Sequence, residues 1–201
     1  MKSILTLSLI LILPTLCLYS QEENAKNVSD VTKLTFFSPG LSYEKAIGKN
    51  QTLYGHAFLA TSLSLGYSSS MGFLSEIHFD PALGIQYRHY YNARKRSNKG
   101  KFIDRNSMNY LALGSETIFS TLPVSDSHLD ETSRRAIQVF SALWGFQRNY
   151  QKRFSLDLNL GLGYLLTRAS IPELNGSISR KNHGQFTTAG QIHLGFWLNR
   201  R

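Results

Sequence analysis

The most constraining feature of this chain is a two-residue alternation from Phe154 to Arg168, FSLDLNLGLGYLLTR. Its even positions from Phe154 to Leu166 are all apolar, whereas its odd positions are polar or glycine except Leu165. Because successive side chains of a β-strand point to opposite faces, this pattern predicts a strand with one apolar and one polar face. Globular strands are typically about 5–6 residues long, whereas a strand that crosses a bilayer in a barrel needs roughly 9–11. The stretch is therefore long enough to span a membrane.

The N-terminus predicts export from the cytoplasm. Lys2 supplies a charged start, an apolar run covers 4–18, and Ser20 stands just before the predicted cleavage site at Gln21. These features are typical of a secretory signal peptide, which we assign to 1–20. The predicted location is therefore the cell envelope.

The remainder is interpreted as a short linker, 21–32, followed by one β-barrel domain, 33–201. The only cysteine, Cys17, lies in the signal peptide, so we expect neither a disulfide nor a thiolate metal site in the mature chain. The formal net charge is +9. Because no nucleic-acid motif accompanies this charge, it favours contact with anionic lipid or lipopolysaccharide phosphates over nucleic acid.

Strand-like segments separated by turn signals follow one another through the whole domain. We expect strands at 33–37, 41–47, 51–67, 76–92, 107–121, 136–150, 154–168 and 184–199. Two assignments stay open: Pro39-Gly40 is either a hairpin turn or a bulge, and 136–150 also fits helical spacing. Taking Pro39-Gly40 as a turn gives an even strand count, as bacterial outer-membrane barrels have. The predicted fold is all-β, an eight-stranded antiparallel up-and-down transmembrane β-barrel.

Connection lengths support an orientation for this barrel. Turns near 48–50 and 151–153 are short, whereas the longer loops lie near 68–75, 122–135 and 171–183, as expected of periplasmic turns and external loops. On this topology the segment 93–104 is a basic periplasmic turn. Its cations are Arg94, Lys95, Arg96, Lys99 and Lys101. They either contact anionic lipid or peptidoglycan, or form a solvated turn.

Four features carry a family resemblance: the signal peptide, the hairpin PGLSYEKAI (39–47), the segment GIQYRHYY (84–91) and an aromatic-rich last strand. Together they resemble the small outer-membrane β-barrel proteins of Gram-negative bacteria, most closely those of Bacteroidota. The resemblance covers 33–200 and implies a monomer inserted by the barrel-assembly machinery, with no common catalytic residues. One departure is the end, since such barrels often finish on an aromatic residue and this chain adds 198–201.

Polar side chains opposite the apolar stripes are expected to line the lumen, the interior of the barrel. The predicted set is His56, Glu76, His78, Asp80, Arg88, Glu116, Asp157, Arg168 and His193. An eight-stranded barrel has an interior just wide enough for side chains, and buried charges must pair. We therefore interpret the set as an ion-pair and hydrogen-bond network that fills the lumen. A gated narrow pore or a small-ligand site is the alternative.

No residue set predicts catalysis, a bound metal or a cofactor. Glu76, His78 and Asp80 share one strand face, but alternate positions lie roughly 7 Å apart, too far for a tight acid–base dyad. A metal site from His56, His78 and Asp80 is conceivable, yet polar lumen residues occur on every strand. The loop SDSHLDE (125–131) holds hydrolase residue types, but adjacency in sequence is not triad geometry.

The preferred function is a non-enzymatic outer-membrane barrel with a structural, adhesive or surface-interaction role. Its expected partners are outer-membrane lipid and lipopolysaccharide. One alternative is a barrel enzyme that modifies outer-membrane lipid, and another is a narrow pore. A soluble lipocalin-like carrier would need its apolar faces to point inward, and the alternating loop lengths argue against it. On the preferred hypothesis, Leu158 faces lipid.

Overall fold

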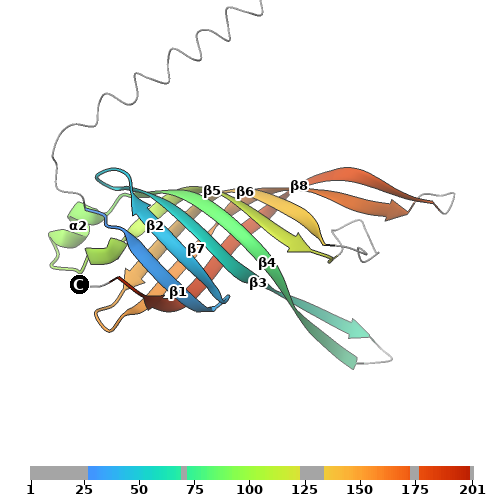
Figure 1. The fold of residues 1–201 in the computed structure, drawn as a ribbon, viewed down its shortest axis with the longest axis horizontal. Helices are drawn as coiled ribbons and strands as arrows, with labels where there is room; N and C mark the ends of the chain where they lie inside the picture. The colour runs from blue at the N-terminus through green and yellow to red at the C-terminus, as the bar shows by residue number, and fades with distance from the viewer. Residues whose placement is uncertain (1–26, 69–71, 123–133, 173–176, 200–201) are drawn as a thin grey trace, which may run out of the picture.

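The computed structural model describes residues 27–68, 72–122, 134–172 and 177–199, with the side chains of 62–68, 72–77 and 171–172 excepted. Eight antiparallel strands form one closed sheet in which each strand pairs with its sequence neighbours and β1 pairs with β8 (Figure 1). The strands are β1 Val31–Phe37, β2 Gly40–Ala46, β3 Gln51–Ser68, β4 Gly72–Tyr90, β5 Asn109–Ser120, β6 Arg135–Asn149, β7 Phe154–Pro172 and β8 Ile178–Trp197. The predicted signal peptide and the loop 125–131 lie outside the described residues.

The Pro39-Gly40 site is a hairpin turn. β1 and β2 are antiparallel, and Thr35 pairs with Gly40 across the turn. The Thr35 hydroxyl donates to the carbonyl oxygen of Ser38 at 2.9 Å, and Ser38 adopts a left-handed φ of 55°. An irregularity between Thr35 and Phe37 does occur, but it lies in the pairing of β1 with β8.

The two ends of the barrel differ. The described segments nearest the chain termini meet at one end, where the amide of Thr32 donates to the side-chain oxygen of Asn199 at 2.7 Å. The short helix α2 (Ala93–Ser97) lies at this same end, which we call the terminal end, while the β3–β4 and β7–β8 hairpins extend from the opposite end, the hairpin end (Figure 1). No helix within the described part of the chain is long and apolar enough to cross a membrane.

Two parts of the predicted layout need correction, and the structure decides one assignment that stayed open. The hairpins are longer than expected, because β4 begins at Gly72, β7 continues to Pro172 and β8 begins at Ile178. The segment 93–104 is not a simple turn, since it contains α2 and leads into the 3-10 turn η2 (Asp104–Asn106). Residues 136–150, which also fitted helical spacing, form β6 through Asn149, because β5 and β7 both pair with this segment.

The barrel is polar inside and apolar outside. Side chains of alternate residues along β7 show this directly, because Asp157 and Asn159 are 1% and 2% exposed whereas Leu160 and Leu162 are 62% and 71% exposed. Leu158 has the parity of the outer face but is half-buried. The same inversion holds on β4, where Arg88 is fully buried whereas Leu83, Ile85 and Tyr87, on the opposite face, are exposed.

β6 and β7 approach each other so closely that there is no room for a side chain at Gly161. A Cβ atom on Gly161 would lie 2.0 Å from the carbonyl oxygen of Ala142, whereas one on Gly163 would lie 3.1 Å from its nearest atoms. We expect Gly161→Ala to lower the free energy of unfolding by about 1–3 kcal/mol, because the backbone must shift. Gly163→Ala, on the same strand face, should cost clearly less. Urea unfolding of both variants tests this, and equal costs would contradict it.

Candidate functional site: the polar lumen

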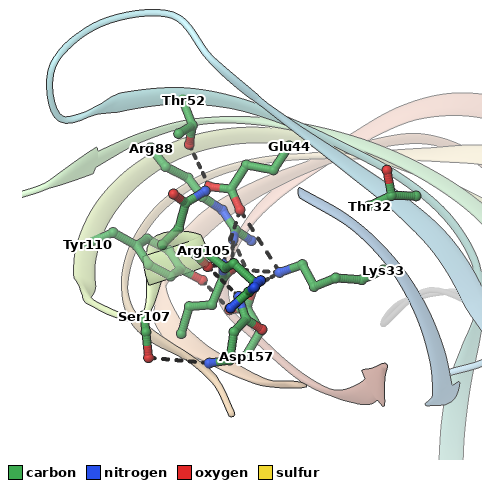
Figure 2. A network of polar contacts seen from close by, with 12 residues as sticks. Thr32, Lys33, Glu44, Thr52, Arg88, Arg105, Ser107, Tyr110 and Asp157 are labelled. Carbon is green, nitrogen blue, oxygen red and sulfur yellow. Dashed lines mark hydrogen bonds and ion pairs between the residues drawn. The ribbon is translucent and has the colours of Figure 1, made fainter. Parts of the chain in front are cut away.

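Four charged side chains from four strands meet inside the barrel (Figure 2). Nη1 of Arg88 lies 2.7 Å from Oδ2 of Asp157, and Nζ of Lys33 lies 3.4 Å from the same oxygen. Nζ of Lys33 also lies 4.0 Å from Oε2 of Glu44. The side chains of all four are at most 2% exposed, so two cations and two carboxylates neutralise one another in the lumen.

Neutral side chains complete this network. Gln147 accepts hydrogen bonds from Lys33 at 2.6 Å and from Arg88 at 3.1 Å, and its amide donates to Glu44 at 3.2 Å. Hydroxyl groups satisfy the remaining carboxylate oxygens: Thr52 and Tyr90 donate to Glu44 at 2.7 and 2.6 Å, and Tyr110 donates to Asp157 at 2.6 Å. This matters because buried ions are tolerated only when their attraction and further hydrogen bonds offset the cost of desolvation.

Two aromatic rings lie against the central guanidinium. The guanidinium carbon of Arg88 lies 3.6 Å from the ring centroid of Tyr54 and 4.4 Å from that of Tyr110. Arginine is suited to this position because its planar group stacks on rings while its edge donates to a carboxylate. The lumen at this level is therefore filled by ordered side chains.

The segment between β4 and β5 covers the network at the terminal end. Arg105 and Asn106 both have left-handed φ values, 53° and 62°. The carbonyl oxygen of Arg105 accepts a hydrogen bond from Gln147 at 3.3 Å and another from Asn149, while the Arg105 guanidinium lies 4.0 Å from the Trp197 ring centroid. The 3-10 turn η2 is therefore hydrogen-bonded to β6 and packed against β8.

A cavity of about 270 Å³ lies among side chains of the lumen, lined in part by His56, Gln86, Glu116, Asn159 and Gln191. Gln191 donates to Glu116 across the barrel, and Nε2 of His56 lies 4.0 Å from the Glu116 carboxylate. The His56 ring stacks on Phe58 with centroids 4.5 Å apart. The cavity wall therefore combines one carboxylate with amides, the His56 imidazole and apolar side chains.

The structure places most of the predicted lumen residues inside the barrel. His56, Asp80, Arg88, Asp157 and His193 are buried. Glu116 lines the cavity, and His78 has the same strand parity as Asp80 and is half-buried. Glu76 belongs to β4, but its side chain is among those that the structure does not describe. Only some of these residues meet. The charged network joins Arg88 to Asp157, whereas His56 and Glu116 line the cavity.

Arg168 is the exception and requires a correction. Its side chain is exposed, and it shares the even parity of Leu160 and Leu166 on β7. Strand alternation therefore directs Arg168 away from the lumen, to the outer wall. The prediction failed because it followed residue type and ignored the parity of the strand.

Sequence reasoning also missed several partners in the network. The set that it omitted comprises Lys33, Glu44, Tyr54, Tyr90, Tyr110 and Gln147. The signal was present, because Lys33 and Thr35 alternate with the apolar Leu34 and Phe36. Tyrosine gives no such signal, since it suits both a lipid-facing wall and a hydrogen-bonded lumen.

The basic cations of 93–104 lie at the terminal end, on and after α2. Arg94, Lys95, Lys99 and Lys101 are exposed, whereas Arg96 folds back and donates to the carbonyl oxygen of Phe102 at 2.9 Å. Within the described residues, no three His, Cys, Asp or Glu side chains are grouped so that they could hold a metal ion. The histidine of the loop 125–131, His128, lies outside the described residues.

Comparison with known proteins gives no family assignment. No protein-family model, curated protein or solved structure matches this chain. The resemblance to small outer-membrane barrels therefore stays a prediction from the sequence, and function has to be inferred from the geometry of the barrel.

Proposed function

We propose that this chain is a non-enzymatic β-barrel of the bacterial outer membrane, with a lumen closed by side chains and a structural or surface-interaction role. The observation that supports the proposal is that the barrel wall is apolar on its outer face and polar on its inner face, the reverse of a water-soluble protein. Leu113, Leu160 and Leu162 are 66%, 62% and 71% exposed on the outside, whereas Lys33 and Arg88 are at most 2% exposed inside. Lipid around the barrel explains both why leucine side chains cover the outer face and why charged side chains are confined to the inside.

Water would be a poor solvent for such a wall. Burying a leucine side chain fully is worth roughly 1.5–3 kcal/mol, and soluble monomers rarely expose continuous apolar patches above a few hundred Å². A lipocalin-like carrier solves this problem by turning its apolar faces inward. Here the inward positions hold the charged network of Lys33, Glu44, Arg88 and Asp157 instead.

Strand length and aromatic placement support the same proposal. Strands β3 to β8 have between 12 and 20 residues each, more than the roughly 9–11 that a membrane-spanning strand needs, whereas β1 and β2 have seven each. Exposed aromatic side chains near the terminal end include Tyr91, Trp144 and Tyr150, and Nε1 of Trp144 donates to the Tyr91 hydroxyl at 2.8 Å. Such amphipathic rings favour the boundary between lipid and water.

The closed lumen favours a structural role over conduction. An eight-stranded barrel leaves room for side chains and little else. Arg88 occupies that room, where it donates hydrogen bonds to Gln147 and Asp157 and lies against the rings of Tyr54 and Tyr110. Ions crossing the lumen would have to break this network.

We expect the protein to require detergent for extraction, to show heat-modifiable mobility on gels, and to give no conductance in planar bilayers. The reason is that the folded barrel resists denaturation in detergent until heated, while its lumen is closed. A boiled sample and a water-filled porin are the controls. Recovery of folded protein from the soluble fraction without detergent would contradict membrane insertion, and steady unitary currents would contradict the closed lumen.

A further inference from the structure

A notch on the barrel surface lies at the hairpin end, where β6 begins at Arg135 and the β7–β8 hairpin continues beyond it. It has a volume of about 820 Å³. The described residues that line it include four arginines, Arg134, Arg135, Arg168 and Arg180. The polar residues Asn182 and His183 also line it. We call this feature the arginine notch.

Strand register brings these cations together. Arg168 pairs with Asn182 and Arg180 pairs with Ser170, so Arg168 and Arg180 are diagonal neighbours on one face of the hairpin. Side chains at such positions are about 7–8 Å apart at their bases. From the other side, the Thr167 hydroxyl donates to the carbonyl oxygen of Ala136 at 3.0 Å, which places the start of β6 beside them.

The arginine notch also lies where the apolar wall ends. Leu160, Leu162, Tyr164 and Leu166 occupy successive even positions of β7, and Arg168 is the first charged residue on that face. Tyr164 and Leu166 line the notch themselves. A ligand there meets guanidinium groups on one side and apolar side chains on the other.

Guanidinium groups select phosphate among anions because their planar donors match its oxygens in bidentate pairs. The adjoining apolar side chains select a phosphate that is attached to acyl chains. We infer that the arginine notch binds the phosphorylated headgroup of an amphiphile such as lipid A, with its chains along the β7 wall. This inference rests on the proposed membrane location, which places the hairpin end at a headgroup layer.

The test uses the full-length mature protein, refolded in neutral detergent micelles, with heat-modifiable mobility checked for each sample. Binding of diphosphorylated lipid A, dephosphorylated lipid A and inorganic pyrophosphate is measured by native mass spectrometry. The variant R134Q/R168Q removes two notch cations. The matched control K99Q/K101Q removes two exposed cations at the terminal end, so both variants lose the same charge.

We expect the wild type and K99Q/K101Q to bind diphosphorylated lipid A alike, and R134Q/R168Q to bind it at least about tenfold more weakly, because charge-assisted hydrogen bonds are lost. Replacement by R168K should give an intermediate affinity, since lysine keeps the charge but not the bidentate geometry. Dephosphorylated lipid should bind weakly to all of them.

Three results would overturn the inference. If both double variants bind diphosphorylated lipid A equally weakly, the lipid is attracted by net charge and not by the notch. If dephosphorylated lipid A binds as tightly as the diphosphorylated form, the notch does not recognise phosphate. If inorganic pyrophosphate binds as tightly as diphosphorylated lipid A, the acyl chains contribute nothing and the ligand is not an amphiphile. Failure of the wild type to give a heat-modifiable, micelle-bound form would instead contradict the proposed membrane location. Folding and binding are read separately, so the two failures are distinguishable.

Discussion

Asp157→Asn is expected to lower the free energy of unfolding by about 3–5 kcal/mol, because it leaves buried cations without their carboxylate. Asp157 accepts contacts from Arg88 at 2.7 Å and Lys33 at 3.4 Å, all with side chains at most 2% exposed. The substitution keeps the shape and leaves an oxygen for the Tyr110 hydroxyl. Urea unfolding in lipid vesicles, followed by tryptophan fluorescence, measures the change.

The matched control is Asp30→Asn. Asp30 lies 2.6 Å from Nζ of Lys45, but their side chains are 37% and 56% exposed, so we expect a cost below about 1 kcal/mol. Replacing both partners, as in Arg88→Met with Asp157→Leu, should cost less than the sum of the single changes, because no charge of that pair is left uncompensated. Similar costs for Asp157→Asn and Asp30→Asn would show that burial does not govern this network.

Leu160→Arg should destabilise the barrel in vesicles by about 2–4 kcal/mol, the cost of an arginine on the lipid face near the bilayer midplane. Leu160 is 62% exposed and lies near the middle of the apolar positions of β7. In a water-soluble barrel the same surface substitution would change stability by no more than about 0.5 kcal/mol. Unfolding titrations in vesicles therefore separate the two environments.

Leu198→Arg is the control for how deep in the bilayer the substituted residue lies. Leu198 is 46% exposed and follows directly after the last residue of β8, at the terminal end. Near the membrane interface an arginine costs only about 0–1 kcal/mol. If both substitutions cost the same, the outer wall does not lie across a bilayer with Leu160 at its centre.

Much of the fold was accessible from local pattern. The alternation from Phe154 to Leu166 predicted both the strand and its two faces. Whether Pro39-Gly40 is a turn or a bulge stayed open in the sequence, and the pairing of Thr35 with Gly40 shows that it is a turn. A period of two residues is a property of the extended chain, so it needs no knowledge of partners. The ends of β7 and β8 were misjudged, because residues beyond Arg168 remain in a strand only by pairing across the hairpin.

The sequence by itself determined which side chains share a face and therefore that one face of the wall is apolar and the other polar. Only the tertiary structure decided which polar groups meet. Lys33 and Asp157 are 124 positions apart and become neighbours because β1 closes the sheet onto β8, beside β7. Arg168 was predicted to face the lumen, but its even position on β7 places it on the outer face, where it lines the arginine notch. Face assignment is a local consequence of backbone geometry, whereas pairing across the lumen depends on closure and register, which no single strand encodes.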